Sequence, residues 1–535
     1  MGAAASLNAV AEQETLVRAL LDPRCYPHRV DEVRLMQTHI SYVLLTGAFA
    51  YKIKKPLDLG FLDFTTLAAR RFFCEEELRL NRRLAPRVYV DVVAIGGTPD
   101  KPVLGAGEPA IEYALRMREF PQTSLLDSML ARGELCAQHI DALAQEIAAF
   151  HGAIGRATPE DGYGSAAGIE APMRQNFTQF AALPLDAEER HELAALAHWS
   201  RREHARLRPA FEQRQRDGFI RECHGDLHLG NVALVDREIE IFDCIEFNAN
   251  LRWIDVMNEA AFLVMDLDER GRPDFAWRFL DGYLTRTGDY AGMRLMRYYQ
   301  VYRALVRAKV ADMRAAQAHL SAEERNAALQ ACAAYMRYAC RITGPSARAL
   351  IVTHGLSGSG KTTVAQALLE GLGAVRLRSD VERKRLHGLA PVARTSSAVG
   401  AGLYDRSATE ATYDELARLA RLIVEAGYTA IVDATFLCHS QRSDFRQLAN
   451  DLRVPFLIVD CRAEAQELRR RVCDRARSAN DASEATLAVL EHQLATAQPL
   501  KDEESPFAIT VETRHLDMAA LVREVRSAVQ RASHP

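Results

Sequence analysis

The chain has 535 residues, more than one hydrophobic core normally accommodates, so two or three domains are expected. Lysine and arginine total 67 against 71 aspartates and glutamates, and the net charge of −4 does not favour nucleic acid or an anionic membrane as a partner. The sequence contains no apolar stretch of about 18 residues and no secretion-type start. Its ten cysteines form no C-x-x-C pair. We expect a cytoplasmic globular protein with reduced, mostly buried thiols, and the pattern indicates no oligomeric state.

Residues 1–121 are predicted to form a β-rich lobe with one helix. Two strands are expected around the Thr46-Gly47 turn within Tyr42–Lys54, because β-branched and aromatic residues flank a turn signal. An amphipathic helix is expected at Phe64–Leu84, which Pro86 would stop, followed by strands at 87–95 and 110–117.

Residues 122–342 are predicted to be mainly helical, for example at 136–154 and 291–314. One β-rich interruption, within Cys223–Cys244, reads as a hairpin with its turn at Asp236-Arg237. A β-rich lobe followed by a helical lobe with an embedded hairpin is typical of an α+β fold.

Residues 343–348 read as a linker, because Gly and Pro interrupt the pattern there. From 349 to 535 apolar strands alternate with helices, which predicts an α/β domain with a parallel sheet. The overall expectation is therefore a multidomain chain.

The segment GLSGSGKT fits the phosphate-binding pattern G-x-x-x-x-G-K-[ST] at every fixed position, after an apolar strand and before a helix. Its glycines allow backbone N–H groups to surround phosphates at a helix N-terminus, Lys361 would neutralise the β- and γ-phosphate oxygens, and Thr362 would offer its hydroxyl to Mg²⁺. The predicted ATP-binding residues are Gly355, Ser357, Gly358, Ser359, Gly360, Lys361, Thr362 and Thr363.

Three later features favour phosphoryl transfer at this site. Asp380 follows the second strand, where it can accept a hydroxyl proton, and Asp433 ends the strand AIVD, where it can orient Mg²⁺, with Thr435 as a possible substrate contact. The arginine-rich run Arg469–Arg477 and the polar stretch Ser478–Ser483 resemble a lid over the γ-phosphate. The alternatives are that Asp380 caps a helix and that the arginines form a solvated helix face.

With these motifs, residues 349–529 resemble the P-loop kinases of small molecules and polynucleotide ends, including the zeta-toxin-like kinases. By that resemblance Asp380 is the candidate base, and Arg471 and Arg475 are the lid arginines.

A second set of residues has the spacing of a kinase catalytic loop. In HGDLHLGN, Asp226 would accept the proton of a substrate hydroxyl, and Asn231 and Asp243 of IFDCIEFN would hold Mg²⁺ against ATP, with His224 bracing the loop. Alternatively, His224 and His228 bind zinc, or Asp226 and Asn231 only form turns.

This loop is similar to that of the aminoglycoside and choline phosphotransferase family, and the resemblance covers about residues 30–341. A phosphate-binding lysine is expected on a strand and paired with a helix glutamate. Lys52 of FAYK is preferred over Lys54 on the same strand face, and Glu77 over Glu75 and Glu76. Met117–Phe120 would be the hinge beside adenine, and no G-x-G-x-x-G precedes the lysine strand.

Four charged residues lie downstream of the catalytic loop. Arg252 and Asp255 would brace that loop or form an ordinary ion pair. Asp266 and Asp268 would line a pocket for a cation or, as we favour, end a helix facing water.

Together the motifs resemble fusions of an aminoglycoside-phosphotransferase-like domain with a P-loop kinase domain, which implies ATP and Mg²⁺ as cofactors and small-molecule hydroxyl groups as acceptors. The hypothesis is a bifunctional ATP:alcohol phosphotransferase with an unidentified acceptor for each half. Three alternatives stay open: one catalytic half with an ATP-sensing half, a kinase of nucleic-acid ends in the P-loop half, and a protein that only holds nucleotide. No role in antibiotic resistance follows.

Overall fold

The computed structural model describes residues 3–60, 62–106, 109–183, 186–317, 320–390, 393, 405–478 and 485–533. Contacts between residues divide the chain into two compact units. The first unit comprises Met1–Ala142, Ala149–Ala171 and Phe211–Leu263, and the second comprises Leu143–Ala148, Pro172–Ala210 and Val264–Pro535. Among the described residues, no helix has the length and apolarity needed to cross a bilayer.

The first unit contains an antiparallel sheet in the order β1-β2-β3-β6-β4-β5. Its strands are β1 (Arg34–Gln37), β2 (Ser41–Leu45), β3 (Phe49–Lys54), β4 (Tyr89–Thr98), β5 (Lys101–Leu104) and β6 (Glu112–Arg118). The predicted turn is confirmed, since β2 and β3 pair around Gly47, which has a φ of 86°.

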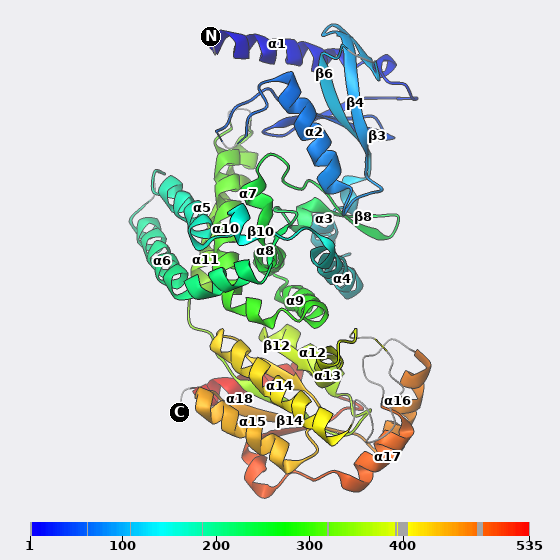
Figure 1. The fold of residues 1–535 in the computed structure, drawn as a ribbon, viewed down its shortest axis with the longest axis vertical. Helices are drawn as coiled ribbons and strands as arrows, with labels where there is room; N and C mark the ends of the chain where they lie inside the picture. The colour runs from blue at the N-terminus through cyan, green and yellow to red at the C-terminus, as the bar shows by residue number, and fades with distance from the viewer. Residues whose placement is uncertain are drawn as a thin grey trace. The chain divides into compact units, whose positions relative to one another are not determined.

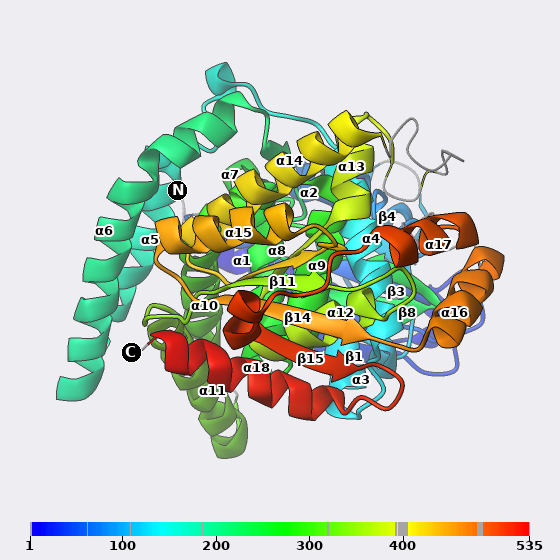
Figure 2. The same cartoon turned by 90° about the horizontal axis from the view of Figure 1, so that it is seen from below.

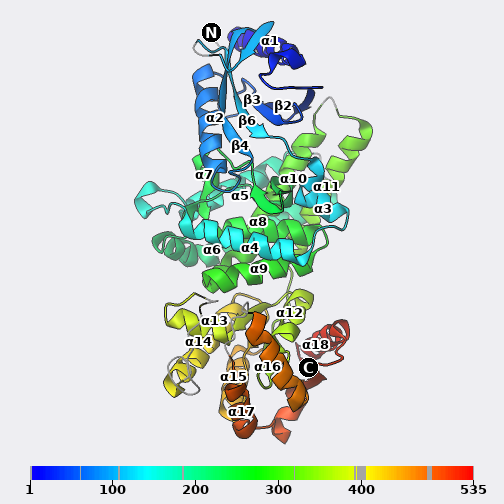
Figure 3. The same ribbon diagram turned by 90° about the vertical axis from the view of Figure 1, so that its right-hand side faces the viewer.

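Two helices lie against this sheet. Helix α1 (Ala3–Ala19) contributes Leu16 and Val17 to a core cluster that also contains Tyr51 and Ile53 of β3. Helix α2 (Leu67–Asn81) lies against β4 and β6, as Figure 3 shows. It is shorter than predicted, because the side chain of Thr66 caps its first turn by accepting from the N–H of Ala69.

The rest of the first unit carries the predicted catalytic loop, His224–Asn231. The predicted hairpin is confirmed as β8 (Val232–Val235) and β9 (Glu238–Ile241), with positive φ at Asp236 and Arg237 in the turn. The remaining elements are η1 (Pro23–Cys25), η2 (Gln122–Ser124), α3 (Leu126–Ala131), η3 (Pro159–Asp161), β7 (Ile220–Glu222), η4 (Leu229–Asn231), α7 (Ala249–Arg252) and β10 (Trp253–Asp255).

Four helices contribute residues to both units: α4 (Ala137–Ala153), α5 (Ala166–Phe180), α6 (Ala187–Arg216) and α8 (Val256–Glu269). The second unit continues with α9 (Pro273–Thr287), η5 (Tyr290–Gly292), α10 (Met293–Ala315) and α11 (Ala322–Ile342).

The second unit also contains the predicted parallel sheet, which has the order β12-β13-β11-β14-β15 and is parallel at every pairing. Its strands are β11 (Leu350–His354), β12 (Val375–Arg378), β13 (Ala430–Asp433), β14 (Phe456–Arg462) and β15 (Ala508–Glu512). The fold class is therefore confirmed: an α+β kinase-like region precedes an α/β P-loop fold.

Helices cover both faces of the parallel sheet (Figures 1 and 2). Helices α12 (Lys361–Leu372) and α18 (Met518–Ser533) enclose the main core on one face, and α14 (Arg406–Glu425) and α15 (His439–Leu452) contact the other. The remaining elements are α13 (Ser379–Leu386), α16 (Ala465–Ser478), α17 (Leu487–Thr496) and η7 (Asp502–Phe507).

All ten cysteines are free thiols, and burial varies among them. Four are buried, five are partly buried, and Cys438 is exposed, so the expectation of mostly buried thiols holds for four of the ten.

Candidate active sites

The first unit gathers two lysines around one glutamate. Strand alternation places Lys52 and Lys54 on the face of β3 opposite Tyr51 and Ile53. The ammonium group of Lys52 lies 2.8 Å from Glu77 of α2, and that of Lys54 lies 2.6 Å from the other oxygen of Glu77. Burial opposes ionisation of Glu77, but Lys52 and then Lys54 outweigh it and lower the pKa of Glu77 to about 2. Glu77, rather than Glu75 or Glu76, is thus the helix glutamate at this cluster.

The two lysines differ in their second partner. Lys52 lies 2.6 Å from Asp243, and its side chain is 11% exposed. Lys54 is 1% exposed and pairs with buried Glu246. Burial opposes the charge of Lys52, but Asp243 and Glu77 outweigh it and raise its pKa. Of the two, Lys52 is the one placed beside a predicted metal ligand.

These differences predict distinct effects of removing each amine. Replacing Lys52 with methionine should weaken ATP binding at this site about tenfold or more, because a charged hydrogen-bond donor to phosphate is lost. Replacing Lys54 should instead destabilise the fold by about 3–5 kcal/mol, because Glu246 loses its partner in the interior. Nucleotide titration and denaturant unfolding separate the two effects. Lys55→Met is the control on the same segment. If the Lys54 variant loses ATP binding while Lys52→Met loses stability, Lys54 is the ATP lysine.

The backbone at Asp243 is held in a strained conformation. Its φ is 64°, which non-glycine residues rarely adopt, and such strain concentrates at functional sites. The hydroxyl of Tyr89 accepts from its N–H at 3.1 Å, and the side-chain oxygen of Asn81 accepts from the N–H of Cys244 at 2.8 Å. Two contacts from β4 and α2 therefore fix the segment that carries the predicted metal ligand.

The catalytic loop places Asp226 beside Asn231. The amide of Asn231 donates to the backbone oxygen of Asp226 at 3.0 Å and to its carboxylate at 3.1 Å. Burial lowers the pKa of His224. Its Nδ1 accepts from the N–H of Asp226, so we assign the proton to Nε2, which donates to the oxygen of Phe242 at 2.9 Å. His224 thus joins the loop to the residue before Asp243.

The histidine contacts argue against the zinc alternative. Both ring nitrogens of His224 have hydrogen-bond partners, and Nδ1 of His228 accepts from the N–H of Gly230 at 3.1 Å. Among the residues that the structure describes, one group has metal-ligand spacing: His151, Cys223 and Glu259.

Glu259, which the sequence did not single out, braces the catalytic loop. Its two oxygens accept from the N–H groups of His224 at 3.0 Å and Gly225 at 2.6 Å, and the first also lies 3.1 Å from Nε2 of His151. Both oxygens of Glu259 are thus engaged in hydrogen bonds, and the thiol of Cys223 donates separately to the backbone oxygen of Ile254 at 3.7 Å.

The residues predicted to brace the loop have other partners. Asp255 forms a bidentate ion pair with Arg214, while Arg252 lies 2.9 Å from Glu76 and 3.4 Å from Glu222. Arg252 and Asp255 thus belong to separate ion pairs and do not pair with each other. The backbone oxygen of Arg252 accepts from the N–H of Cys223, directly before the loop.

The pKa of Glu259 links this brace to pH. Burial would raise it, but the hydrogen bond with His151 and those from the loop outweigh burial and lower it from 4.5 to about 2. A lowered pKa stabilises the fold above pH 4.5, and the stabilisation disappears as pH falls towards 2. At neutral pH the lowered pKa of Glu259 contributes about 3 kcal/mol to the free energy of unfolding.

Replacing Glu259 with glutamine should therefore lower the thermal midpoint at pH 7, and the difference from the unaltered protein should narrow below pH 4.5. Thermal unfolding followed across pH 3–7 tests this. A difference that stays constant across this range would contradict the assigned pKa.

A cleft of about 710 Å³ lies in the first unit where the hinge was predicted. Arg118, Glu119 and Phe120 line it, together with Phe49 and the β8–β9 hairpin. The carboxylate of Glu119 accepts from the N–H of Gly47 at 2.7 Å, which joins the predicted hinge to the β2–β3 turn. This cleft has the size of a small-molecule pocket and suits a nucleotide base.

Asp266 and Asp268 lie in the second unit and do not both face water. Asp266 is fully buried and pairs with Arg270 one turn later, at 3.0 Å, so the favoured interpretation is wrong for it. Asp268 pairs with Arg341 at 3.2 Å.

The phosphate-binding loop of the second unit runs from β11 into α12. Gly360 precedes the helix with a φ of 89°, and a Cβ at Gly355 would lie 2.4 Å from the oxygen of Cys461, so both positions require glycine. The amine of Lys361 donates to the oxygen of Leu356 at 2.7 Å, and burial lowers the pKa of Lys361. The loop and the start of α12 together present a phosphate-binding surface.

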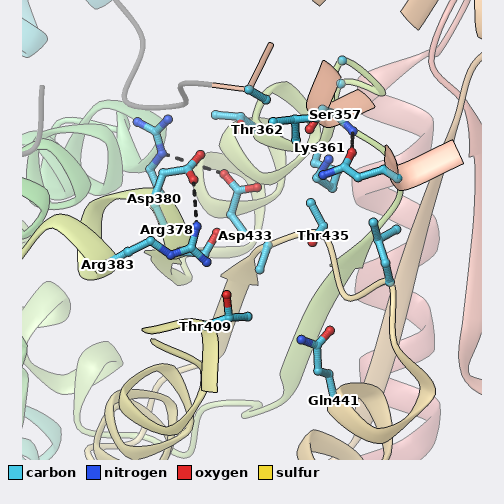
Figure 4. Close-up of a pocket in the computed structure, with 18 of the residues that line it drawn as sticks. Ser357, Lys361, Thr362, Arg378, Asp380, Arg383, Thr409, Asp433, Thr435 and Gln441 are labelled. Atoms are coloured by element: carbon cyan, nitrogen blue, oxygen red, sulfur yellow. Dashed lines mark hydrogen bonds and ion pairs between the residues drawn. The ribbon is translucent and has the colours of Figure 1, made fainter. Parts of the chain in front are cut away.

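A cavity of about 490 Å³ joins this loop to the ends of β12 and β13 (Figure 4). The predicted residues that line it are Ser357, Gly358, Gly360, Lys361, Thr362, Thr363, Asp380, Asp433, Thr435, Arg471 and Arg475. The parallel pairing of β12 with β13 places Arg378 opposite Asp433, which is why the ends of the two strands meet here.

The two carboxylates of this cavity each lie near an arginine. Asp433 is 3.9 Å from Arg378, and Asp380 is 4.0 Å from Arg383 (Figure 4). Helix α13 begins at Ser379 with Arg378 as its N-cap, so the alternative that Asp380 caps the helix is wrong. Asp380 lies in the first turn instead, with its side chain on the cavity.

The arginine run of α16 divides between cavity and solvent. Arg471 and Arg475 line the cavity, whereas Arg470 and Arg477 are 65% and 82% exposed. Arg471 donates to the hydroxyl of Thr513 at 2.9 Å. The solvated-face alternative therefore holds for part of the run. The predicted polar stretch Ser478–Ser483 lies outside the described residues beyond Ser478, where α16 ends.

One contact with the phosphate-binding loop was not predicted. The side-chain oxygen of Gln493 on α17 accepts from the N–H of Ser357 in the phosphate-binding loop at 2.8 Å. Gln493 also lines the cavity, so α17 reaches the loop directly.

Comparison with known proteins identifies the class of each half. Residues 70–296 match the family model described as "Phosphotransferase enzyme family", and residues 350–500 match the model described as "AAA domain". With the kinase-like cluster in one unit and the P-loop cavity in the other, the chain is a kinase, that is, a phosphotransferase that uses ATP.

The chain is 30% identical over 490 residues to the uncharacterized protein Rv2004c of Mycobacterium tuberculosis, covering 89% of this chain and 96% of that protein. It therefore belongs to the family of that mycobacterial protein.

Two solved structures are similar to parts of this chain. The amicoumacin kinase hAmiN in complex with AMP-PNP, Ca²⁺ and Ami is 14% identical with a TM-score of 0.39, covering 63% of this chain and 94% of that one. A gluconokinase from Sinorhizobium meliloti is 21% identical with a TM-score of 0.25, covering 35% and 94%.

Proposed function

We propose that the chain is a bifunctional phosphotransferase with two ATP sites, each of which transfers the γ-phosphate to a hydroxyl group of a small molecule. The observation that carries the proposal is the recurrence of one set of functional groups in both units. Lys52, Asp226 and Asp243 supply a cation, a base and a metal ligand in the first unit. Lys361, Asp380 and Asp433 supply the same three in the second unit.

In both sites the reaction follows the same course. The carboxylate of Asp226 or Asp380 takes the proton of the acceptor hydroxyl, whose oxygen forms a bond to the γ-phosphorus while the bond to the bridging oxygen of ADP breaks. Mg²⁺ would be held by Asn231 and Asp243 in one site and by Thr362 and Asp433 in the other, where it offsets phosphate charge. Lys52 and Lys361 bind phosphate oxygens, and Arg471 and Arg475 stabilise the charge that develops on the transferred group.

The dimensions of the P-loop cavity support a small acceptor. About 490 Å³ must hold the reacting phosphates and the acceptor together, within the usual range for small-molecule pockets. Thr409, Thr435 and Gln441 face this space with hydroxyl and amide groups, which suit a polar acceptor (Figure 4).

The test is a screen of a metabolite pool and, separately, of oligonucleotides with ATP labelled at the γ-phosphate, using the full chain and its Lys52→Met and Lys361→Met variants. Two labelled products, each lost in one variant only, support the proposal. A single labelled product indicates that one half is catalytic and that the other half senses ATP. Bound ATP without any transfer indicates a nucleotide-holding protein, and a labelled oligonucleotide lost with Lys361 indicates a nucleic-acid-end kinase.

A further inference from the structure

Helix α9 is packed against the P-loop half within the second unit, where it contacts α12 and β12 (Figure 1). Trp277 on α9 packs on the core that α12 and α18 form. A Cβ at Gly373, directly after α12, would lie 2.8 Å from the Nε1 atom of Trp277. At the edge of this contact, Arg278 and Glu370 form a partly exposed ion pair at 2.9 Å.

A buried ion pair lies inside the same contact. Asp281 on α9 accepts two hydrogen bonds from Arg376 on β12, at 2.6 Å from Nη2 and 3.2 Å from Nε. Their side chains are only 8% and 5% exposed. The pair is bidentate and desolvated, so its geometry is specific.

The remaining contacts of Arg376 lead to the P-loop site. Its third nitrogen, Nη1, donates to the backbone oxygen of Thr362 at 3.3 Å. Burial opposes the charge of Arg376, but Asp281 and, more weakly, Asp433 outweigh it, so the pKa of Arg376 is raised. Arg376 therefore joins Asp281 to the backbone of Thr362 by hydrogen bonds, and the charge of Asp433 acts on it as well. Thr362 and Asp433 are the two residues that would hold the metal ion.

We propose that Asp281 is a positioning residue of the P-loop active site, which holds the guanidinium of Arg376 away from Asp433 and against the backbone of Thr362. This inference rests on the proposed function, because it assigns Thr362 and Asp433 to Mg²⁺. Without the carboxylate of Asp281, the buried guanidinium is left to the attraction of Asp433, whose charge also acts on Arg376, and it competes there with Mg²⁺. The metal affinity of the P-loop half thus depends on a residue of the region that matches the phosphotransferase family.

The test measures nucleotide binding by the full chain at increasing Mg²⁺ concentration, in a Lys52→Met background that reports the P-loop site. In Asp281→Asn, the Mg²⁺ concentration for half-maximal binding should rise about tenfold, as for other residues that orient metal ligands. Saturating Mg²⁺ should restore the nucleotide affinity. Glu370→Gln, which breaks the rim pair of the same contact, should change the Mg²⁺ requirement less than about twofold.

A double variant distinguishes this role from a purely structural one. Asp281→Asn combined with Arg376→Met removes the competing cation, so the Mg²⁺ requirement should return to within about twofold of the starting protein. If Asp281 is only structural, the second substitution should instead raise the Mg²⁺ requirement further. If Asp281→Asn alone does not fold, the Mg²⁺ requirement of the double variant still tests the role of Asp281.

The inference is overturned if Asp281→Asn keeps its Mg²⁺ requirement, if Glu370→Gln shifts it equally, or if the double variant is not restored. These outcomes do not depend on finding an acceptor. If the P-loop site binds Mg²⁺ and nucleotide but phosphorylates nothing, the proposed function fails while the Mg²⁺ titration still decides the role of Asp281.

Discussion

Replacing Asp226 with asparagine should lower phosphate transfer by the first site about 10²–10⁴-fold, because the acceptor hydroxyl loses its proton acceptor. Asparagine keeps the shape of the side chain and can still contact Asn231, which now lies 3.1 Å from the carboxylate. Nucleotide affinity should change little, since the phosphates contact Lys52 instead. Product formation is measured with Asp226→Asn placed in a Lys361→Met background, because the rate that remains in that background is due to the first site.

Asp217→Asn is the matched control, because it makes the same chemical change at an exposed position of the first unit. More than about a tenth of the original rate in Asp226→Asn would exclude Asp226 as the general base.

The second large effect is expected at Lys361. Replacing it with methionine should weaken nucleotide binding at the P-loop site about 100-fold, because a buried cation that contacts the β- and γ-phosphates is removed. ATP at 100 times its dissociation constant stabilises a site by about 2.7 kcal/mol, and the variant should lose most of that stabilisation. Thermal unfolding of the second unit, measured with and without Mg-ATP, reports this loss.

Lys501→Met serves as the control, since the side chain of Lys501 is 55% exposed and its ammonium group lies 3.9 Å from Glu503. If ATP stabilises Lys361→Met as strongly as the unaltered protein, the assignment of Gly355–Thr362 to ATP is wrong.

The parts of both sites that the sequence predicts well are contiguous. In Gly355–Thr362 and in His224–Asn231, the functional residues lie on one loop, so their spacing alone fixes their relative positions. The position of Asp433 could also be predicted, because the carboxyl ends of parallel strands meet at one edge of a sheet. The parallel sheet itself follows from the alternation of apolar strands and helices.

The residues that the sequence did not reveal act alone and across long separations. Glu259 contacts the loop at His224, 35 residues away, and Gln493 contacts Ser357, 136 residues away. A single glutamate or glutamine on a helix has no local signature of such a role, because its partner is set by tertiary packing.

Local patterns also failed to resolve choices between neighbours. Lys52 and Lys54 share one strand face, so alternation cannot separate them, and their different second partners come from a segment about 190 residues away. Asp266 was expected to face water because aspartate normally does, yet it is buried against Arg270. The boundary at residues 343–348 and the roles assigned to individual site residues stay predictions.

The ion pair between Asp281 and Arg376 also constrains how this chain can change over time. Losing either side chain alone leaves a charge buried without its partner, which is far more costly than losing both. We therefore expect related chains to keep the pair or to replace both members together. If a P-loop half were exchanged between relatives, a matching α9 would have to be exchanged with it. The segment that must be inherited together therefore includes α9 as well as the P-loop half.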